Sequence, residues 1–169
     1  MIFLKNKDEL KLIDRACKIV RDTLFYIEEF VVPDATPLDL DRMAEEFIKS
    51  KGAIPGFKGL YGFPNTLCVS IEEEVVHGIP SDRKLKKGDI VGIDVGSIYE
   101  DFYGDHAKTF IVENTTLDKK KLVNQPMFPP NHPLHSKSKK REVALNGKYT
   151  SWNGNGQKKS EKNYKDGKK

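Results

Sequence analysis

Apolar residues near the start of the chain recur at steps of three and four positions, the spacing of one face of an α-helix. Asn6 can cap this helix, and Glu9 three positions later completes a capping box. The pattern predicts an amphipathic helix that ends before Pro33, because proline cannot continue helical hydrogen bonding. Its apolar face consists of Leu10, Ile13, Cys17, Val20, Leu24, Ile27 and Val31.

A second amphipathic helix follows directly. Thr36 can cap it, Pro37 suits its first position, and Gly52 is placed to end it. A loop rich in glycine and proline is then expected over residues 52–64. The apolar positions of this helix are Leu40, Met43, Ala44, Phe47 and Ile48.

From residue 65 onward the pattern changes to that of β-strands. Apolar residues alternate over 67–71, a strongly apolar run covers 90–98, and residues 103–112 run back after a turn. Because two helices precede a meander of antiparallel strands, the sequence predicts an α+β fold.

Charge divides the chain into two parts. Residues 126–169 hold eleven Lys and Arg against three Asp and Glu, a net charge of +8, whereas residues 1–125 carry −4. Only nine of the last forty-four residues are apolar, and they follow no helical or strand period. We therefore expect a folded domain over 1–125 and a basic, low-complexity, disordered tail over 126–169.

Several classes of protein are not indicated. No apolar run approaches the ~20 residues of a membrane span, and charged residues follow the first four positions, unlike a signal peptide. Cys17 and Cys68 fit no zinc-ribbon or redox spacing, so a reduced cytoplasmic setting is expected.

Two aspartates lie at matching points of the predicted strand pair. Asp94 interrupts an apolar strand, where an ionised carboxylate is unfavourable unless a metal, a cation or several donors meet it. If Tyr99 and Glu100 form the centre of the hairpin, Asp94 directly faces Asp105, with Cβ atoms about 4.5–5.5 Å apart. A divalent cation would remove their repulsion, and Mn, Fe, Co and Zn all suit such ligands. A structural interpretation stays open, because Lys108 could pair with either aspartate.

His77 is the other candidate for chemistry. The glycine and proline that follow it suggest a loop that presents the ring, which can hydrogen-bond a substrate or transfer a proton near neutral pH. A structural hydrogen-bonding role stays open and is the commoner one for a lone histidine after two valines. His106 should point to the opposite face from Asp105 and is not assigned to a metal. The glutamates at 72–74 are expected to form a solvated turn.

Taken together, these motifs resemble the type I methionine aminopeptidases. The match extends over residues 3–123 and includes the opening helix pair and the strand with 65–66 (NT) and 70–73 (SIEE). The motifs that carry the resemblance, in family order and spacing, are 75–80 (VVHGIP), 87–91 (KGDIV), 93–96 (IDVG) and 103–110 (YGDHAKTF).

The resemblance implies the first half of a pita-bread fold and the removal of initiator Met from nascent chains. It implies two divalent ions (Co, Mn, Fe or Zn), with Asp94 binding one ion and Asp105 bridging both. His77 would contact the substrate and assist proton transfer. The loop 59–63 and Cys68 are candidate walls of the Met pocket. The implied partners are nascent polypeptides and, transiently, the ribosome, with no membrane and no specific nucleic acid.

The chain departs from the family pattern after Gln125. The family takes a His and two Glu ligands from its second half, and no matching motif follows Pro126. His132 and His135 lie in a Pro/Ser/Lys context and are expected to be exposed tail residues. We therefore expect a truncated domain with little or no activity by itself, followed by a tail that is disordered or read out of frame.

Three alternatives remain. A pita-bread peptidase that cleaves before proline is disfavoured by the HGIP context of residues 77–80. A non-catalytic binding protein of the same fold is disfavoured by the presence of both Asp94 and Asp105. A basic arm for RNA or the ribosome would use the lysines of 126–169, which bind phosphate without specificity.

Overall fold

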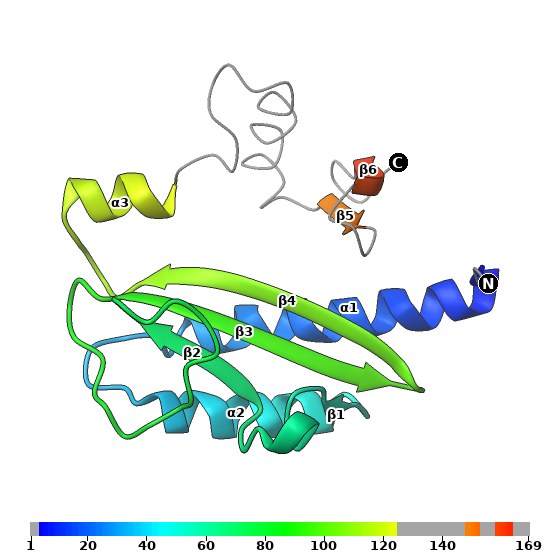
Figure 1. Cartoon of the computed structure of the whole chain (residues 1–169), viewed down its shortest axis with the longest axis horizontal. Coiled ribbons are helices and arrows are strands. Elements are labelled where there is room, and N and C mark those ends of the chain that lie inside the picture. Colours follow the sequence, from blue (N-terminus) through cyan, green and yellow to red (C-terminus); the bar gives the residue numbers. More distant parts are fainter. Residues whose placement is uncertain (1–3, 125–147, 153–157, 164–169) are drawn as a thin grey trace. The chain divides into compact units, whose positions relative to one another are not determined.

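The computed structural model describes residues 4–124, 148–152 and 158–163 (Figure 1). The chain divides into two compact units, Met1–Val123 and Asn124–Lys169. The described part of the first unit consists of helices followed by antiparallel strands and a short closing helix, which confirms the predicted α+β order.

Helix α1 spans Lys7–Glu28 and begins as the sequence predicts. The Asn6 side-chain oxygen accepts the backbone N–H groups of Asp8 and Glu9, each at 2.9 Å. The Glu9 carboxylate accepts the Asn6 N–H in return at 2.7 Å. The capping box is therefore confirmed. The buried residues of α1 are Ala16, Ile19, Val20, Thr23, Leu24 and Ile27.

Helix α2 spans Pro37–Ser50, and both of its predicted ends are confirmed. The Thr36 hydroxyl accepts the Asp39 N–H at 3.2 Å. Beyond the helix, Gly52 adopts a left-handed conformation with φ of 73°, which glycine tolerates without strain.

The strands of the first unit form one antiparallel sheet around a central strand. This strand, β3 (Ile90–Tyr99), pairs along one edge with β4 (Phe102–Ile111). Along its other edge it pairs with β2 (Leu67–Ile71) and with the short β1 (Ile54–Pro55). The remaining helical segments are η1 (Leu60–Gly62) and α3 (Leu117–Val123).

The helices cover one face of the sheet. Helix α1 packs on β3 and β4, while α2 packs on β1 and β2, as Figure 1 shows. Ser97 of β3 donates its hydroxyl to the Ala16 carbonyl at 3.1 Å. On β4, a Cβ at Gly104 would lie 2.4 Å from the Ala16 backbone, so only glycine allows this approach. Residues of both helices and β2–β4 build the core, among them Leu24, Leu40, Ile48, Leu67, Val69, Val91, Ile93, Val95 and Phe110.

The β3–β4 hairpin turns one position later than the sequence suggested. Its two central residues are Glu100 and Asp101, with φ of 47° and 64°, as a tight two-residue hairpin turn requires. Tyr99 instead stays in the strand, packs against the core and pairs with Phe102. An aspartate tolerates the left-handed conformation better than a bulky tyrosine does, which accounts for the observed position of the turn.

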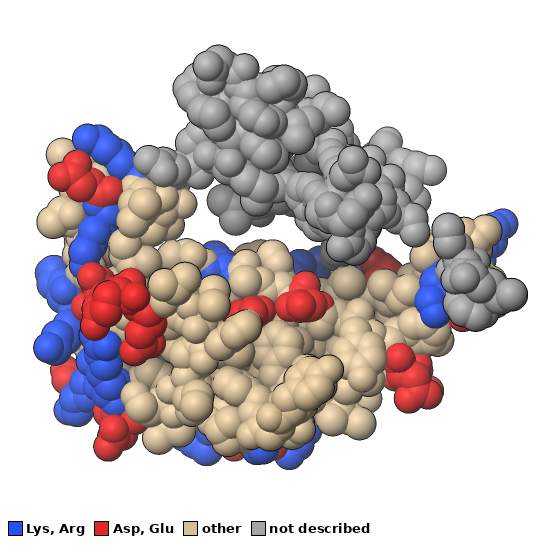
Figure 2. All heavy atoms as spheres, viewed as in Figure 1, with Lys and Arg blue, Asp and Glu red and all other residues tan. Residues whose placement is uncertain are grey.

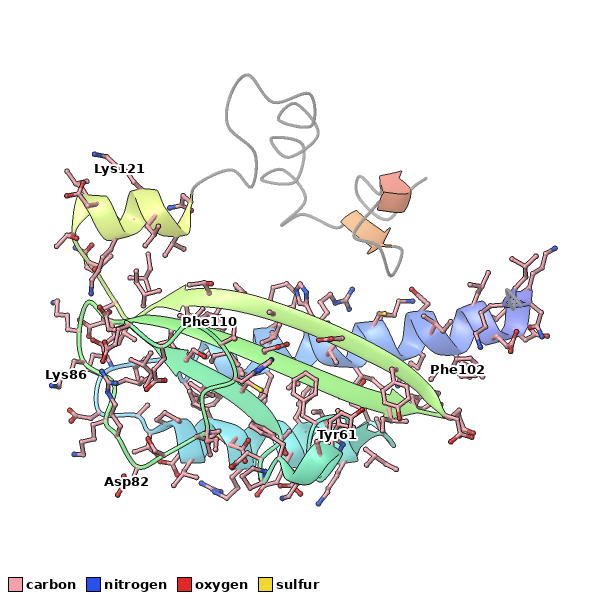
Figure 3. The ribbon with its side chains drawn as sticks, viewed as in Figure 1. Tyr61, Asp82, Lys86, Phe102, Phe110 and Lys121 are labelled. Carbon is pink, nitrogen blue, oxygen red and sulfur yellow. The ribbon has the colours of Figure 1, made fainter. Side chains whose placement is uncertain are left out.

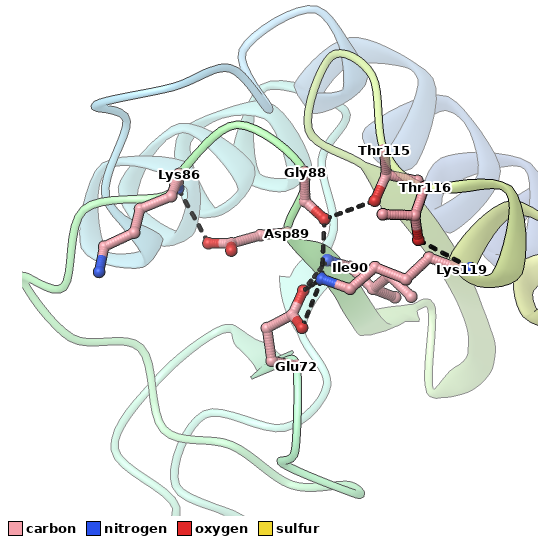
Figure 4. Close-up of polar contacts among 8 residues, drawn as sticks. All are labelled: Glu72, Lys86, Gly88, Asp89, Ile90, Thr115, Thr116 and Lys119. Atoms are coloured by element: carbon pink, nitrogen blue, oxygen red, sulfur yellow. Dashed lines mark hydrogen bonds and ion pairs between the residues drawn. The ribbon is translucent and has the colours of Figure 1, made fainter.

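Glu72 was expected in a solvated turn, but it joins three segments (Figure 4). Its carboxylate accepts the Ile90 N–H at 2.7 Å and pairs with the Lys119 ammonium at 2.6 Å. Lys119 also donates to the Gly88 carbonyl at 3.0 Å. The Lys119 charge lowers the pKa of Glu72. These bonds attach α3 to the start of β3.

The second unit contains a hairpin that the sequence analysis did not predict. Strands β5 (Lys148–Trp152) and β6 (Lys158–Asn163) pair antiparallel. Tyr, Thr and Trp in β5 have high β propensity, although they lack an apolar alternation that would have indicated a strand. The rest of the predicted tail, with His132 and His135, lies outside the described residues.

Across the described residues, the structure contains no helix with the length and apolar character needed to cross a membrane.

Asp41 is a buried carboxylate that joins α2 to the start of β2. It is only 6% exposed and accepts the N–H groups of Thr66 and Leu67 at 2.8 and 2.7 Å. The Asn65 side-chain amide donates to it at 2.9 Å. The amphipathic pattern does not reveal this role, because the partners lie more than twenty positions away along the chain.

We expect Asp41→Ala to lower the free energy of unfolding by about 2–3 kcal/mol, because it leaves two backbone N–H groups without their acceptor. Urea denaturation of the full chain measures the change. Glu46→Ala is the matched control, since Glu46 lies on the same helix and is 67% exposed. An Asp41→Ala variant as stable as this control would contradict the structural role.

Candidate metal and substrate site

The two candidate aspartates lie on the face of the sheet that α1 and α2 leave open. Along β3, side chains alternate, so Ile93 and Val95 are buried toward the helices while Asp94 points the other way. The register places Asp94 opposite Ala107 and Asp105 opposite Gly96.

The predicted direct pairing of Asp94 with Asp105 is therefore wrong. The later turn shifts the register by two positions, which makes the two residues diagonal neighbours instead of opposite ones. A shift of two preserves the face, so both carboxylates still point to the same side. Diagonal neighbours remain within reach of each other's side chains, and the charge of Asp105 acts on the Asp94 carboxyl group.

The surroundings of Asp94 make its ionised form unfavourable. Burial raises its pKa to about 6, and the negative charge of Asp105 adds to the rise. Its Oδ1 atom is buried and has no hydrogen-bond partner. Asp105 is exposed. A cation placed at this pair would satisfy the unpartnered oxygen and remove the repulsion.

A cavity of about 540 Å³ opens above the two aspartates. One wall is the segment around η1, where Figure 3 marks the fully exposed Tyr61. The ring of Phe57 lies on Gly96, where a Cβ would come within 2.6 Å of it, so glycine lets this segment approach β3. The lining consists of Phe57, Leu60, Tyr61, Gly62, Phe63, Pro64, Cys68, His77, Ile79, Asp94 and Asp105.

Surface charge is unevenly distributed over the part drawn in Figure 2. Acidic side chains in the middle of the visible face are surrounded by uncharged surface, whereas Lys, Arg, Asp and Glu gather at the end that carries α3 and the β2–β3 connection. The cavity lining has the same character, with mostly apolar walls and two carboxylates.

Cys68 and His77 line the cavity on the side where β2 lies. Cys68 lies opposite Asp94 in the sheet. Burial raises the pKa of its thiol to about 11, with further contributions from Asp94 and Asp105, so the thiol stays protonated near neutral pH. His77 is exposed at the cavity, and both residues also line an adjoining cavity of about 250 Å³.

The other candidates lie away from the site. Lys108 does not neutralise the aspartates, because its ammonium pairs with Glu28 of α1 at 2.6 Å. His106 sits opposite the buried Val95, on the face away from Asp105, as expected. Within residues 4–124 and the two strands of the tail, no three His, Cys, Asp or Glu residues gather to hold a metal.

The donor set fits a divalent cation in part. Two carboxylates on one face and a buried, unpartnered oxygen suit oxygen coordination of a hard or borderline ion. The described residues would therefore hold an ion on one side only. The sequence analysis did not identify Phe57, Ile79 and Gly96 as part of the site. Gly96 could have been recognised, because it is a glycine two positions after the aspartate of the strand.

The raised pKa of Asp94 makes the metal-free protein less stable as pH rises. The folded state holds the Asp94 proton more tightly than the unfolded state, whose ordinary value is 3.8. Stability is therefore lost between about pH 4 and pH 7 as the folded carboxyl ionises. Asp94→Asn removes this loss and should gain about 1 kcal/mol relative to wild type over that range, allowing for solvent screening.

Urea denaturation of both proteins with chelator present measures this gain. Asp101→Asn, at the tip of the same hairpin, is the control and should show no such gain. If Asp94→Asn changed the free energy of unfolding equally at both ends of the pH range, the raised pKa assigned to Asp94 would be contradicted.

The matches to known proteins cover the same part of the chain as this domain. Residues 11–125 match the metallopeptidase family M24. The methionine aminopeptidase of Clostridium perfringens is 49% identical over 123 residues, which make up 73% of this chain and 49% of that protein. The one from Helicobacter pylori is 43% identical over 122 residues, 72% of this chain and 48% of that protein. The chain thus spans about half the length of these curated relatives.

Solved structures that are similar to this chain lead to the same family. The methionine aminopeptidase from Rickettsia prowazekii superposes with a TM-score of 0.71 at 36% identity, covering 73% of this chain and 50% of that one. The one from Thermotoga maritima has a TM-score of 0.71 at 34% identity, covering 90% and 66%. A prolidase from Pyrococcus furiosus, with a TM-score of 0.62 at 23% identity over 70% of this chain and 34% of that one, shares the fold alone. The chain therefore belongs to metallopeptidase family M24, and its domain around Asp94 and Asp105 has the fold of the first half of the pita-bread structure of the methionine aminopeptidases.

Proposed function

We propose that this chain supplies the carboxylate side of a divalent-metal site that removes the N-terminal methionine from nascent proteins. The observation that carries the proposal is the pair Asp94 and Asp105 on the open face of one hairpin, with Asp94 Oδ1 buried and unpartnered. The identity of up to 49% with proteins named methionine aminopeptidase supports it.

The resemblance to the methionine aminopeptidases implies a role for each of these residues. Asp94 would bind one ion and Asp105 would bridge two. When bound, the ions lower the pKa of a water molecule and stabilise the charge that develops on the scissile carbonyl. His77, exposed at the cavity edge, would hydrogen-bond the substrate near this carbonyl and hold or release a proton. The protonated Cys68 and the 59–63 segment would form the apolar wall that accepts the methionine side chain.

The ligand set within the described residues sets a limit on activity. Two carboxylates hold a divalent ion loosely, and the family site uses a His and two Glu in addition. We therefore propose that this chain alone has little or no peptidase activity, and that the metal is Co, Mn, Fe or Zn. We further propose that residues 1–125 form the peptidase-like domain, that 126–169 form a separate basic tail, and that the chain works in the cytoplasm with transient ribosome contact.

Metal binding tests the core of the proposal. Isothermal titration of the full chain with Mn²⁺ or Co²⁺ should give one weak site, and Asp94→Asn or Asp105→Asn should weaken it at least about tenfold, because each removes a charged ligand. Asp101→Asn, an exposed aspartate outside the cavity, should bind as wild type does. Binding that survives both site substitutions would overturn the assignment.

Peptide recognition tests the substrate. NMR titration of the Co²⁺-loaded chain with a Met-Ala-type peptide should shift the signals of Tyr61 and Cys68, while a Gly-Ala peptide of equal length should not. Release of methionine should stay near background. Rapid turnover would contradict the incomplete ligand set, and preference for an X-Pro peptide would favour the proline-specific alternative. Metal-independent peptide binding would favour a non-catalytic binding protein.

A further inference from the structure

The segment that presents His77 is held to the edge of β2 by unusually close backbone contacts. The Val69 N–H donates to the Gly78 carbonyl at 2.8 Å, and the Gly78 N–H donates to the Ser70 hydroxyl at 3.2 Å. Gly78 is therefore bonded through both its amide and its carbonyl. A Cβ at this position would lie 2.1 Å from the Val69 carbonyl oxygen, so no other residue fits.

His77 itself adopts a left-handed backbone conformation with φ of 58°. A left-handed conformation is uncommon for residues other than glycine, although histidine adopts it more readily than most. The nearest constraints on His77 along the chain are the hydrogen bonds made by the next residue, Gly78. In the part of the chain that the structure describes, Ser70 is the one side chain of β2 that contributes to them, and it is only 8% exposed.

The other end of the segment is fixed by Glu74. Its carboxylate accepts the Ile71 N–H at 3.0 Å, and its own N–H donates to the Ile71 carbonyl at 3.2 Å. Arg83 lies 3.7 Å from the same carboxylate. Both ends of the 72–78 segment are thus attached to β2, the strand that also carries Cys68 into the cavity.

We propose that Ser70 is a positioning residue for His77. By accepting the Gly78 N–H, the Ser70 hydroxyl keeps His77 left-handed and directs its imidazole into the cavity that contains Asp94 and Asp105. Ser70 and His77 both line the smaller cavity beside Asp94, so the two side chains lie on the same face of the sheet. The role of the imidazole in substrate binding rests on the proposed function, whereas its positioning by Ser70 does not.

The test compares Ser70→Ala with Ser70→Thr in the full chain. Ser70→Ala removes the acceptor, so the Gly78 amide should exchange with solvent about tenfold faster. Ser70→Thr keeps the hydroxyl and should restore slow exchange. Ser70→Cys, which keeps the volume but accepts weakly, should lie between them and serves if the alanine variant folds poorly. Ser81→Ala is the matched control, since that hydroxyl accepts the Arg83 N–H in the adjoining loop.

A second readout follows the ring itself. With Co²⁺ bound, the His77 ring protons should show one set of paramagnetic shifts in wild type, in Ser70→Thr and in Ser81→Ala. In Ser70→Ala these shifts should shrink and broaden as the ring samples other orientations. A merely structural role for Ser70 would lower the melting temperature and leave the shifts of the folded fraction unchanged.

The outcomes separate the two proposals. Unchanged Gly78 exchange and unchanged His77 shifts in Ser70→Ala would overturn the positioning role while the metal site stands. If no variant and no wild-type protein binds Co²⁺, the proposed function fails. In that case the exchange rate of Gly78 and the diamagnetic linewidth of the His77 ring decide the positioning role by themselves.

Discussion

Two like charges held on one hairpin are the constraint around which this domain is arranged. Asp94 loses solvent inside the sheet, faces the charge of Asp105 and leaves one oxygen without a partner. A purely structural sheet would gain stability by replacing such a residue with an apolar one. Its presence is physically reasonable where a cation meets the pair, which supports the proposed metal site on the open face.

The helices make that open face possible by packing on the other side of the sheet. Helix α1 contacts the hairpin through the Ala16 backbone, which Gly104 and Ser97 approach closely. Val91, Ile93 and Val95 of β3 point toward the helices and are buried, so the aspartates are left on the side that the helices do not reach. Burial on one face thus determines the direction of the carboxylates on the other.

Close backbone approaches shape the cavity as well. At Gly96 the ring of Phe57 lies against β3, and at Gly78 the His77 segment lies against β2. Each contact brings a segment that is distant in sequence to the margin of the carboxylate pair. A side chain at either glycine would push its segment away, and the apolar wall or the imidazole would be displaced from Asp94 and Asp105.

Local patterns along the chain were sufficient for helices α1 and α2, their N-terminal caps, the order of strands β2, β3 and β4 and the shared face of Asp94 and Asp105. Caps and amphipathic periods depend on neighbours within a few residues, so they can be read from the sequence. The tertiary structure decided the register of the hairpin, because the packing of Tyr99 placed the turn at Glu100 and Asp101. It also decided the roles of Asp41, Glu72 and Ser70, whose partners come from other parts of the chain and become neighbours only when the sheet has formed.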